Sequence, residues 1–127
     1  MHTLSAVFLV GGAVFFAALF GIPLLVAPMS WAKRVGWKIP EERALANYLG
    51  RSLGGVIMAI VVVALQAARD PWQNRILFDL TFWIGLFMVV VHAYGWIRKN
   101  QPVVEHLEIF LYGGLSVLSW LLYPNPP

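Results

Sequence analysis

The sequence of 127 residues contains no cysteine and little charge. Without cysteine the chain forms no disulfide, and it supplies no thiolate for structural zinc, an iron–sulfur cluster or cysteine catalysis. Charged residues make up 12% of the chain, whereas an ordinary soluble domain carries about 25%. Hydrophobic residues make up 60%, which is more apolar surface than one core of this size can bury. The composition therefore excludes a water-soluble globule and predicts an integral membrane protein.

Four stretches are long and apolar enough to cross a membrane as helices, which takes about 20 residues. Pro23 is expected to kink the last turns of the first, and Asp70 with Pro71 to begin the third helix. The chain start lacks the basic residues of a signal peptide, so we expect the first span to be retained. Because the connections between the spans are short, we expect residues 1–127 to form one all-α domain, an antiparallel up-down bundle of four transmembrane helices. The spans are residues 4–27, 45–67, 76–97 and 104–123.

Basic residues in the short loops predict the orientation, because cytoplasmic loops carry an excess of Lys and Arg. One side has six, against Arg69 and Arg75 on the other. The sequence thus predicts a multi-pass protein of the cell inner (cytoplasmic) membrane with both termini on the non-cytoplasmic side. This placement of the net charge of +3 also argues against nucleic-acid binding. The six are Lys33, Arg34, Lys38, Arg43, Arg98 and Lys99.

The longest loop interleaves tryptophan with basic residues. Residues 30–38 read Ser-Trp-Ala-Lys-Arg-Val-Gly-Trp-Lys. Such a segment is typical of a short interfacial helix that lies against anionic lipid. The alternative is a loop whose charges only set the topology.

Small residues spaced four apart predict the faces along which the helices pack, since helices in lipid associate by close backbone approach. Gly85, Gly113 and Gly114 could serve similarly in the last two spans. On the first two spans the packing residues are Ala13, Ala17 and Gly21, then Gly50 with Gly54 and Gly55 with Ala59.

Few ionisable residues fall inside the predicted spans, and three of these share one depth. Arg51, His92 and Glu108 lie roughly 6–9 Å below the predicted cytoplasmic interface, at a rise of 1.5 Å per residue. Because charged groups in a membrane generally face the bundle interior, we expect Arg51 to pair with Glu108 and His92 to hydrogen-bond the pair. The whole predicted polar layer comprises Asn47, Arg51, His92, Glu105, Glu108 and Tyr112.

Three interpretations of this polar layer stay open. It can be a structural clamp that fixes the helix register, a polar pocket for a lipid head group or a quinone, or a proton or ion path. The sequence shows no metal-ligand cluster, no phosphate-cradling loop and no Ser/His/Asp arrangement. Asp79 is expected to form a surface pair with Arg75, one helical turn earlier.

His92 adds a cofactor hypothesis. A single imidazole within a span can ligate a haem iron or the magnesium of a chlorophyll-type pigment. A haem with two histidine ligands is not expected, because His106 falls at the interface and His2 on the opposite side. A hydrogen-bonded histidine in the helix interior is the simpler interpretation.

The second and third spans contain short glycine-bearing segments. Residues 46–55 read Ala-Asn-Tyr-Leu-Gly-Arg-Ser-Leu-Gly-Gly, with Ala-Arg-Asp-Pro at 68–71, and Gly-Leu-Phe at 85–87 leads to Val-His-Ala-Tyr at 91–94. In these segments, its size and its span number, the chain resembles the DoxX-like and BphX-like small four-helix bacterial inner-membrane proteins. The resemblance covers about half the chain. It implies an accessory membrane role, in one branch beside quinone-linked oxidoreductase complexes, and carries over no catalytic residue.

The leading functional hypothesis is a non-enzymatic membrane subunit or scaffold that docks within the lipid bilayer onto other integral membrane subunits of a larger complex. Minimal extramembrane mass, several small-residue faces and the lack of a catalytic cluster favour it. A small transporter or channel is the third hypothesis. It ranks below the others because one chain of four short spans could form a pore or transport path only as an oligomer. The alternative to the scaffold is a quinone- or lipid-binding redox accessory protein whose polar pocket uses Arg51, His92, Glu108 and Tyr112.

Overall fold

The computed structural model describes residues 2–126, of which 77% are helical and none form a strand. The helical part of the predicted fold is therefore confirmed. The elements in chain order are α1 (Thr3–Phe16), the π-helix η1 (Ala17–Gly21), α2 (Ile22–Val26), α3 (Pro28–Arg34), α4 (Ala44–Ala67), α5 (Ile76–Arg98) and α6 (Val104–Leu121).

Within the described residues, three stretches of helix are long and apolar enough to cross a membrane, as expected of a membrane protein. They are Thr3–Val26, Ala44–Ala67 and Ile76–Arg98, close to the first three predicted spans. The fourth predicted span, residues 104–123, is helical as α6 but is not among the three. It has 18 residues and carries two glutamates in its first turns.

The first stretch is disturbed where Pro23 was expected to kink it. Because proline has no N–H, the Leu19 carbonyl four residues earlier loses its α-helical partner. The chain widens into η1 just before Pro23, and the Trp31 indole N–H donates to the Leu19 carbonyl at 2.8 Å. The helix then continues to Val26, and a break at Ala27 starts α3. Pro23 therefore frees the Leu19 carbonyl for Trp31 of α3, and the break itself falls directly before Pro28.

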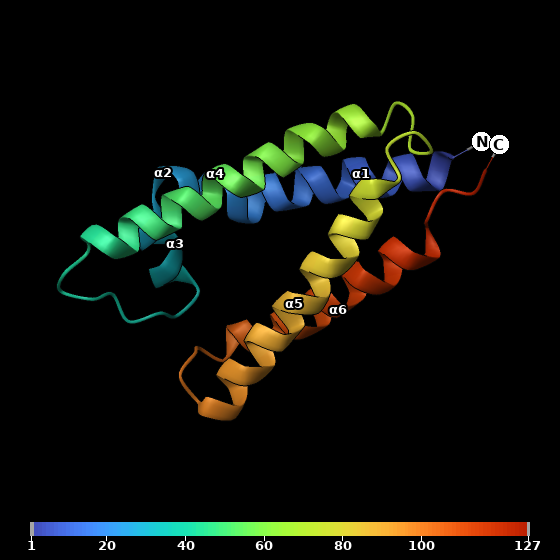
Figure 1. Ribbon diagram of the computed structural model, residues 1–127. Coiled ribbons are helices and arrows are strands. Elements are labelled where there is room, and N and C mark those ends of the chain that lie inside the picture. Colours follow the sequence, from blue (N-terminus) through green and yellow to red (C-terminus); the bar gives the residue numbers. More distant parts are fainter. Residues whose placement is uncertain (1, 127) are drawn as a thin grey trace.

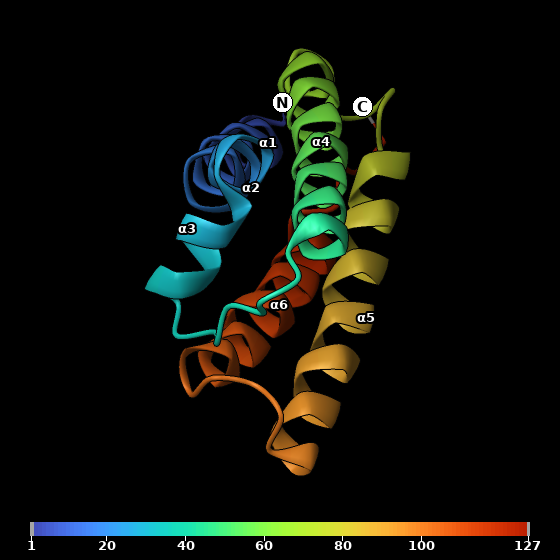
Figure 2. The same cartoon turned by 90° about the vertical axis from the view of Figure 1, so that its left-hand side faces the viewer.

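The long helices form two antiparallel hairpins that diverge from one end of the molecule (Figure 1). One hairpin joins α1, η1 and α2 to α4, and the other joins α5 to α6. Both termini and the connection 68–75 lie at the end where the hairpins meet, here called the closed end. The opposite end, here called the open end, carries α3 and the connections 35–43 and 99–103. Figure 2 shows α3 extending from α2 toward the α5–α6 connection.

The closed end is packed with apolar side chains from both hairpins. Phe78 of α5 is fully buried, and its ring lies 5.8 Å from that of Phe8 and 6.0 Å from that of Tyr123. The Ser5 hydroxyl donates to the Leu122 carbonyl at 2.8 Å, which joins α1 to the end of α6. Around these contacts the core contains Leu9, Ala13, Val61, Ala64, Ala67 and Leu77.

Small residues allow the backbones of the first hairpin to touch. A Cβ at Gly54 would lie 2.5 Å from the Leu25 nitrogen and 2.9 Å from the Gly21 carbonyl oxygen, so only glycine fits. A Cβ at Gly50 would lie 2.5 Å from the Cβ of Pro28, where α3 begins.

The remaining small residues of the predicted packing faces lie in different settings. Ala13 is buried in the core, and Ala17 packs against it. Gly55 has only the end of the Leu25 side chain within 4.0 Å. In the second hairpin, a Cβ at Gly85 would meet the Ser116 side chain and the Tyr112 carbonyl of α6.

The connection 68–75 differs from its prediction. Asp70 accepts a hydrogen bond from the Gln73 backbone N–H at 3.2 Å, but the segment forms turns and α5 begins only at Ile76. The expected Arg75–Asp79 pair is wrong: Arg75 stacks over the Trp72 ring at 4.6 Å, and Asp79 accepts from the Tyr123 hydroxyl at 3.2 Å. The Tyr123–Asp79 hydrogen bond thus joins the end of α6 to α5, whereas the Arg75 contact stays within the connection 68–75.

Candidate functional site

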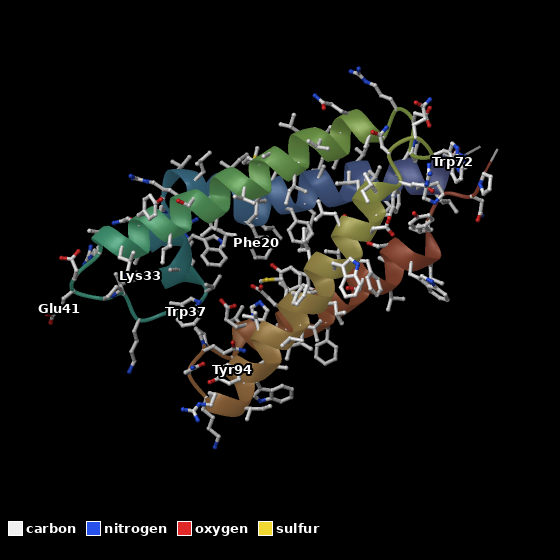
Figure 3. The ribbon with its side chains drawn as sticks, viewed as in Figure 1. Phe20, Lys33, Trp37, Glu41, Trp72 and Tyr94 are labelled. Carbon is white, nitrogen blue, oxygen red and sulfur yellow. The ribbon has the colours of Figure 1, made fainter. Side chains whose placement is uncertain are left out.

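A cavity of about 460 Å³ lies between the two hairpins. Its walls are mostly apolar and come from α1, η1, α2, α4, α5 and α6, including Phe8, Phe16 and Leu115. Part of the lining is aromatic, and part is ionisable. In Figure 3 the Phe20 side chain points into the space between the hairpins, and Trp37 lies between α3 and the second hairpin. The aromatic and ionisable lining residues are Phe8, Phe16, Phe20, Trp31, Trp37, His92, Glu105, Glu108 and Tyr112.

Three ionisable side chains, His92, Glu105 and Glu108, form a cluster in the cavity wall. The His92 Nδ1 atom lies 3.4 Å from Glu105 Oε2, and Nε2 lies 3.2 Å from Glu108 Oε2. The His92 and Glu105 side chains are only 7% and 6% exposed, and that of Glu108 is 12% exposed. One imidazole thus lies between two carboxylates that are nearly out of contact with solvent. We call these three residues the His–Glu cluster.

The backbone at the end of α3 directs Trp37 into this cluster. Gly36 has φ +96 and ends the helix: its N–H bonds to Lys33, and the Trp37 N–H bonds to Ala32. This is the Schellman arrangement, in which glycine takes the left-handed position that other residues resist. The chain turns back, and the Trp37 indole N–H donates to Glu105 Oε1 at 2.7 Å. One Glu105 oxygen therefore faces Trp37 while the other faces His92.

His92 is held from two further directions. The Tyr112 ring stacks on the imidazole, with centroids 5.5 Å apart and an angle of 12° between the planes. Lys99 in a left-handed conformation ends α5. The chain then turns so that Gln101 donates from Nε2 to the His92 carbonyl oxygen at 2.9 Å. These contacts fix both the ring and the backbone of His92.

Neither ring nitrogen of His92 has a hydrogen-bond partner, although each faces a carboxylate oxygen. A hydrogen bond needs the acceptor close to the N–H axis, and these oxygens lie off it. A buried polar atom without a partner is costly, so each of these nitrogens is a candidate contact atom for a proton or a ligand. The arrangement can share protons, meet a polar ligand group or hold a cation.

The structure places the predicted polar layer differently from its prediction. Among the described residues no ion pair joins Arg51 to Glu108, so that predicted pair is wrong: Glu108 instead faces His92. Arg51 is exposed on α4, and Asn47 is partly buried outside the cavity lining. The physical reason is the divergence of the hairpins at the open end. Helix depth alone cannot reveal that α4 turns its polar residues away from the cavity.

The other members, His92, Glu105, Glu108 and Tyr112, are brought together. Sequence reasoning missed Trp37 and Gln101 as their partners. One signal for Trp37 was present in the sequence. Gly36 follows a basic helical turn, and a glycine at this position is typical of a helix C-terminus where the chain reverses. Of the segment 30–38, residues 30–34 belong to α3 and the rest form the connection that follows it, and Trp31 and Trp37 line the cavity.

The histidine-ligated cofactors do not fit the geometry. Both nitrogens of His92 lie within 3.4 Å of a carboxylate oxygen, and the ring face is stacked on Tyr112. A haem or chlorophyll-type macrocycle would have to displace a glutamate to reach either nitrogen. His106 stacks on Trp96 at 5.0 Å instead of joining this cluster.

Comparisons with protein-family models, with curated proteins and with solved structures give no match for this chain. The resemblance to the DoxX-like and BphX-like proteins therefore stays a prediction from the sequence.

Proposed function

We propose that this chain is a multi-pass membrane protein that binds one neutral amphipathic molecule of the quinone or quinol class between its two hairpins. The observation that carries the proposal is a cavity of about 460 Å³ with mainly apolar walls and a buried ionisable cluster. Small-molecule sites commonly combine an apolar lining with a few placed polar groups. The apolar tail would follow the walls, and the ring would lie against the His–Glu cluster.

The charges of the lining favour a neutral head group. Within residues 2–126, no lysine or arginine lines the cavity, while Glu105 and Glu108 do. An anionic phosphate head group would therefore meet carboxylates without a cation to pair with it, which is costly away from water. A quinol hydroxyl can donate to a carboxylate, and a quinone carbonyl can accept from a protonated one. A neutral ring with oxygen substituents satisfies both protonation states of the cluster.

The aromatic lining favours a planar head group. Phe16, Phe20, Trp31 and Tyr112 present ring surfaces in the same cavity, and Phe20 and Trp31 pack at 5.8 Å. Planar rings stack favourably on such side chains. The proposal therefore develops the quinone- or lipid-binding alternative and assigns the chain a binding role without catalysis.

The proposal includes the membrane arrangement. We place α6 as a fourth span, which completes an antiparallel up-down arrangement of transmembrane helices. The excess of basic residues puts the open end on the cytoplasmic side of the inner membrane and both termini on the other side. The His–Glu cluster then lies near the cytoplasmic interface.

Docking onto a larger membrane complex is the second candidate function. It is favoured by Gly11 and Gly114, which are exposed, lie outside the cavity lining and have open space where a Cβ would be. Such positions let a neighbouring helix approach closely. Stoichiometric copurification with larger membrane subunits in mild detergent would support this role.

Tryptophan fluorescence tests quinone binding, because Trp31 and Trp37 line the cavity and quinones quench indole fluorescence. The purified protein in mild detergent is titrated with a decyl-benzoquinone. We expect saturable quenching that is reduced in Trp37→Phe and unchanged in Trp83→Phe, whose indole is exposed outside this cavity. Quenching that rises without saturation, or equally in both variants, would reflect partition into the micelle and overturn the proposal.

A further inference from the structure

The His–Glu cluster has the donor set of a metal site. His92, Glu105 and Glu108 each offer a ligand atom, and these atoms all lie within 4.8 Å of one another. Imidazole nitrogen and carboxylate oxygen together suit divalent transition-metal ions. The sequence pattern does not indicate this cluster, because His92 belongs to α5 and the two glutamates belong to α6. The turn between α5 and α6 brings them together.

Either nitrogen–oxygen pair of the cluster has the spacing of two ligands around one ion, and the third donor atom lies nearby. In a tetrahedral zinc site with bonds of about 2.0–2.2 Å, ligand atoms are about 3.3–3.6 Å apart. The distances of 3.4 and 3.2 Å run from different nitrogens of His92, so one ion would use one nitrogen and its nearer carboxylate oxygen. The other carboxylate then supplies the third donor atom, within 4.8 Å of these two. Both nitrogens of His92, whose side chain is 7% exposed, also lack a hydrogen-bond partner.

The charges of the His–Glu cluster also favour a bound cation. Two carboxylates and one imidazole converge at a nearly solvent-free site, and in the described part of the chain no lysine or arginine joins them in an ion pair. Buried charge has to be neutralised by a partner, by a proton or by a metal ion. A divalent cation would neutralise both carboxylates with the imidazole uncharged.

Neighbouring residues hold the side chains of the cluster in position. Ligands of metal ions are usually oriented in this way by hydrogen bonds from residues that do not touch the ion. The Trp37 indole N–H holds one Glu105 oxygen at 2.7 Å and leaves the other turned toward His92. Gln101 fixes the backbone of His92, and Tyr112 fixes its ring. The donor atoms are therefore oriented before any ion arrives.

We propose that His92, Glu105 and Glu108 bind one divalent transition-metal ion, of the zinc or manganese type, in the wall of the intramembrane cavity. One imidazole nitrogen and one oxygen from each glutamate would be the protein ligands. The remaining coordination position faces the cavity and is filled by water or by an oxygen of a cavity ligand. This site goes beyond quinone binding and does not depend on it, because its assay contains no quinone.

Calorimetric titration tests the site. Protein purified without a histidine tag is stripped with EDTA, returned to mild detergent and titrated separately with Zn²⁺ and with Mn²⁺. We expect one ion per chain for at least one of them, and affinity at least 100-fold weaker in Glu108→Gln and in His92→Ala. Asp79→Asn and His106→Ala are the controls with unchanged affinity. No stoichiometric binding by the wild type, or equal binding by Glu108→Gln, would overturn the assignment.

Absorption of bound Co²⁺ tests the site in the wild-type protein, so the result does not depend on whether the variants fold. Co²⁺ added to the stripped wild-type protein should give visible bands of a four- or five-coordinate ion at one equivalent, and Zn²⁺ should remove them. Trp37→Phe leaves all three ligands in place and should weaken metal binding about tenfold through loss of the hydrogen bond to Glu105. A wild-type spectrum identical to that of free Co²⁺ would also overturn the assignment.

Discussion

The closed and open ends of this molecule are built from the same four long helical segments but packed in opposite ways. At the closed end, apolar side chains from both hairpins meet around the fully buried Phe78, and Ser5 hydrogen-bonds the end of α6. At the open end the hairpins separate, α3 and Trp37 enter the space between them, and His92 meets two glutamates.

This difference in packing indicates that contacts at the closed end stabilise the fold, whereas the space toward the open end can hold a ligand. In lipid there is no hydrophobic drive between helices, so close packing of side chains and backbones is what holds them together. That packing is concentrated at the closed end and along the Gly54 contact. Incomplete packing toward the open end leaves a cavity, and the buried ionisable residues of the helices gather in its wall. Substitutions at the two ends should therefore affect different properties.

The largest loss of stability is expected for Phe78→Ala at the closed end. Removing a fully buried phenylalanine leaves a cavity between the hairpins and should lower the free energy of unfolding by about 3 kcal/mol. Unfolding by SDS in mixed micelles measures this change. Phe87→Ala, which truncates an exposed ring on the same helix, is the control with little effect. Equal losses in both variants would mean that the closed end is not the main point of attachment.

Gly54→Ala should come next. Its added Cβ would lie 2.5 Å from a backbone nitrogen, which cannot move aside as a flexible side chain can. We expect a loss of about 2 kcal/mol from the forced separation of α2 and α4. Gly114→Ala adds the same methyl group where nothing lies within 4 Å and should be neutral or slightly stabilising. The same SDS titration compares the pair, and a neutral Gly54→Ala would refute the backbone contact.

Trp37→Phe probes the open end and should separate binding from stability. The variant loses the indole hydrogen bond to Glu105, so metal affinity falls about tenfold while the free energy of unfolding changes by about 1 kcal/mol or less. Calorimetry and SDS titration of the same preparation measure both quantities. A large stability loss with unchanged metal affinity would reverse the assigned roles of the two ends.

Arg51→Gln is expected to have the smallest effect. Because this arginine is exposed on α4 and pairs with no glutamate of the cluster, stability should change by about 0.5 kcal/mol or less. Metal and quinone affinities should stay at their wild-type values. A loss as large as that of Gly54→Ala would restore the Arg51–Glu108 pair that the sequence suggested.

The helical architecture was predictable because the hydropathy of a segment indicates whether lipid or water surrounds it. Three spans agree with the structure to within a few residues, since an apolar stretch of the right length has few other stable conformations in lipid. The depth argument also selected His92 and Glu108, whose distance from the helix ends could be counted. It could not select the partner of Glu108, because helix rotation and the angle between hairpins decide which residues at one depth face each other.

The support around the cluster was harder to predict for a different reason. Trp37 and Gln101 reach it through chain reversals at Gly36 and Lys99, where left-handed residues redirect the chain after a helix. The sequence marks the first reversal with a glycine, but the second occurs at a lysine that gives no such signal. The cavity itself arises from the divergence of the hairpins, which no periodicity in the sequence records.

The most direct test of quinone-class binding in the cavity compares two adjacent glycines of α1. Gly12 lines the cavity and Gly11 does not, and an added Cβ would meet nothing within 4 Å at either position. Decyl-benzoquinone affinity, measured by tryptophan quenching, should fall about tenfold or more in Gly12→Leu, because the new side chain occupies the space of the ligand. Gly11→Leu should bind like the wild type. Equal affinity in the two variants would contradict binding between the hairpins.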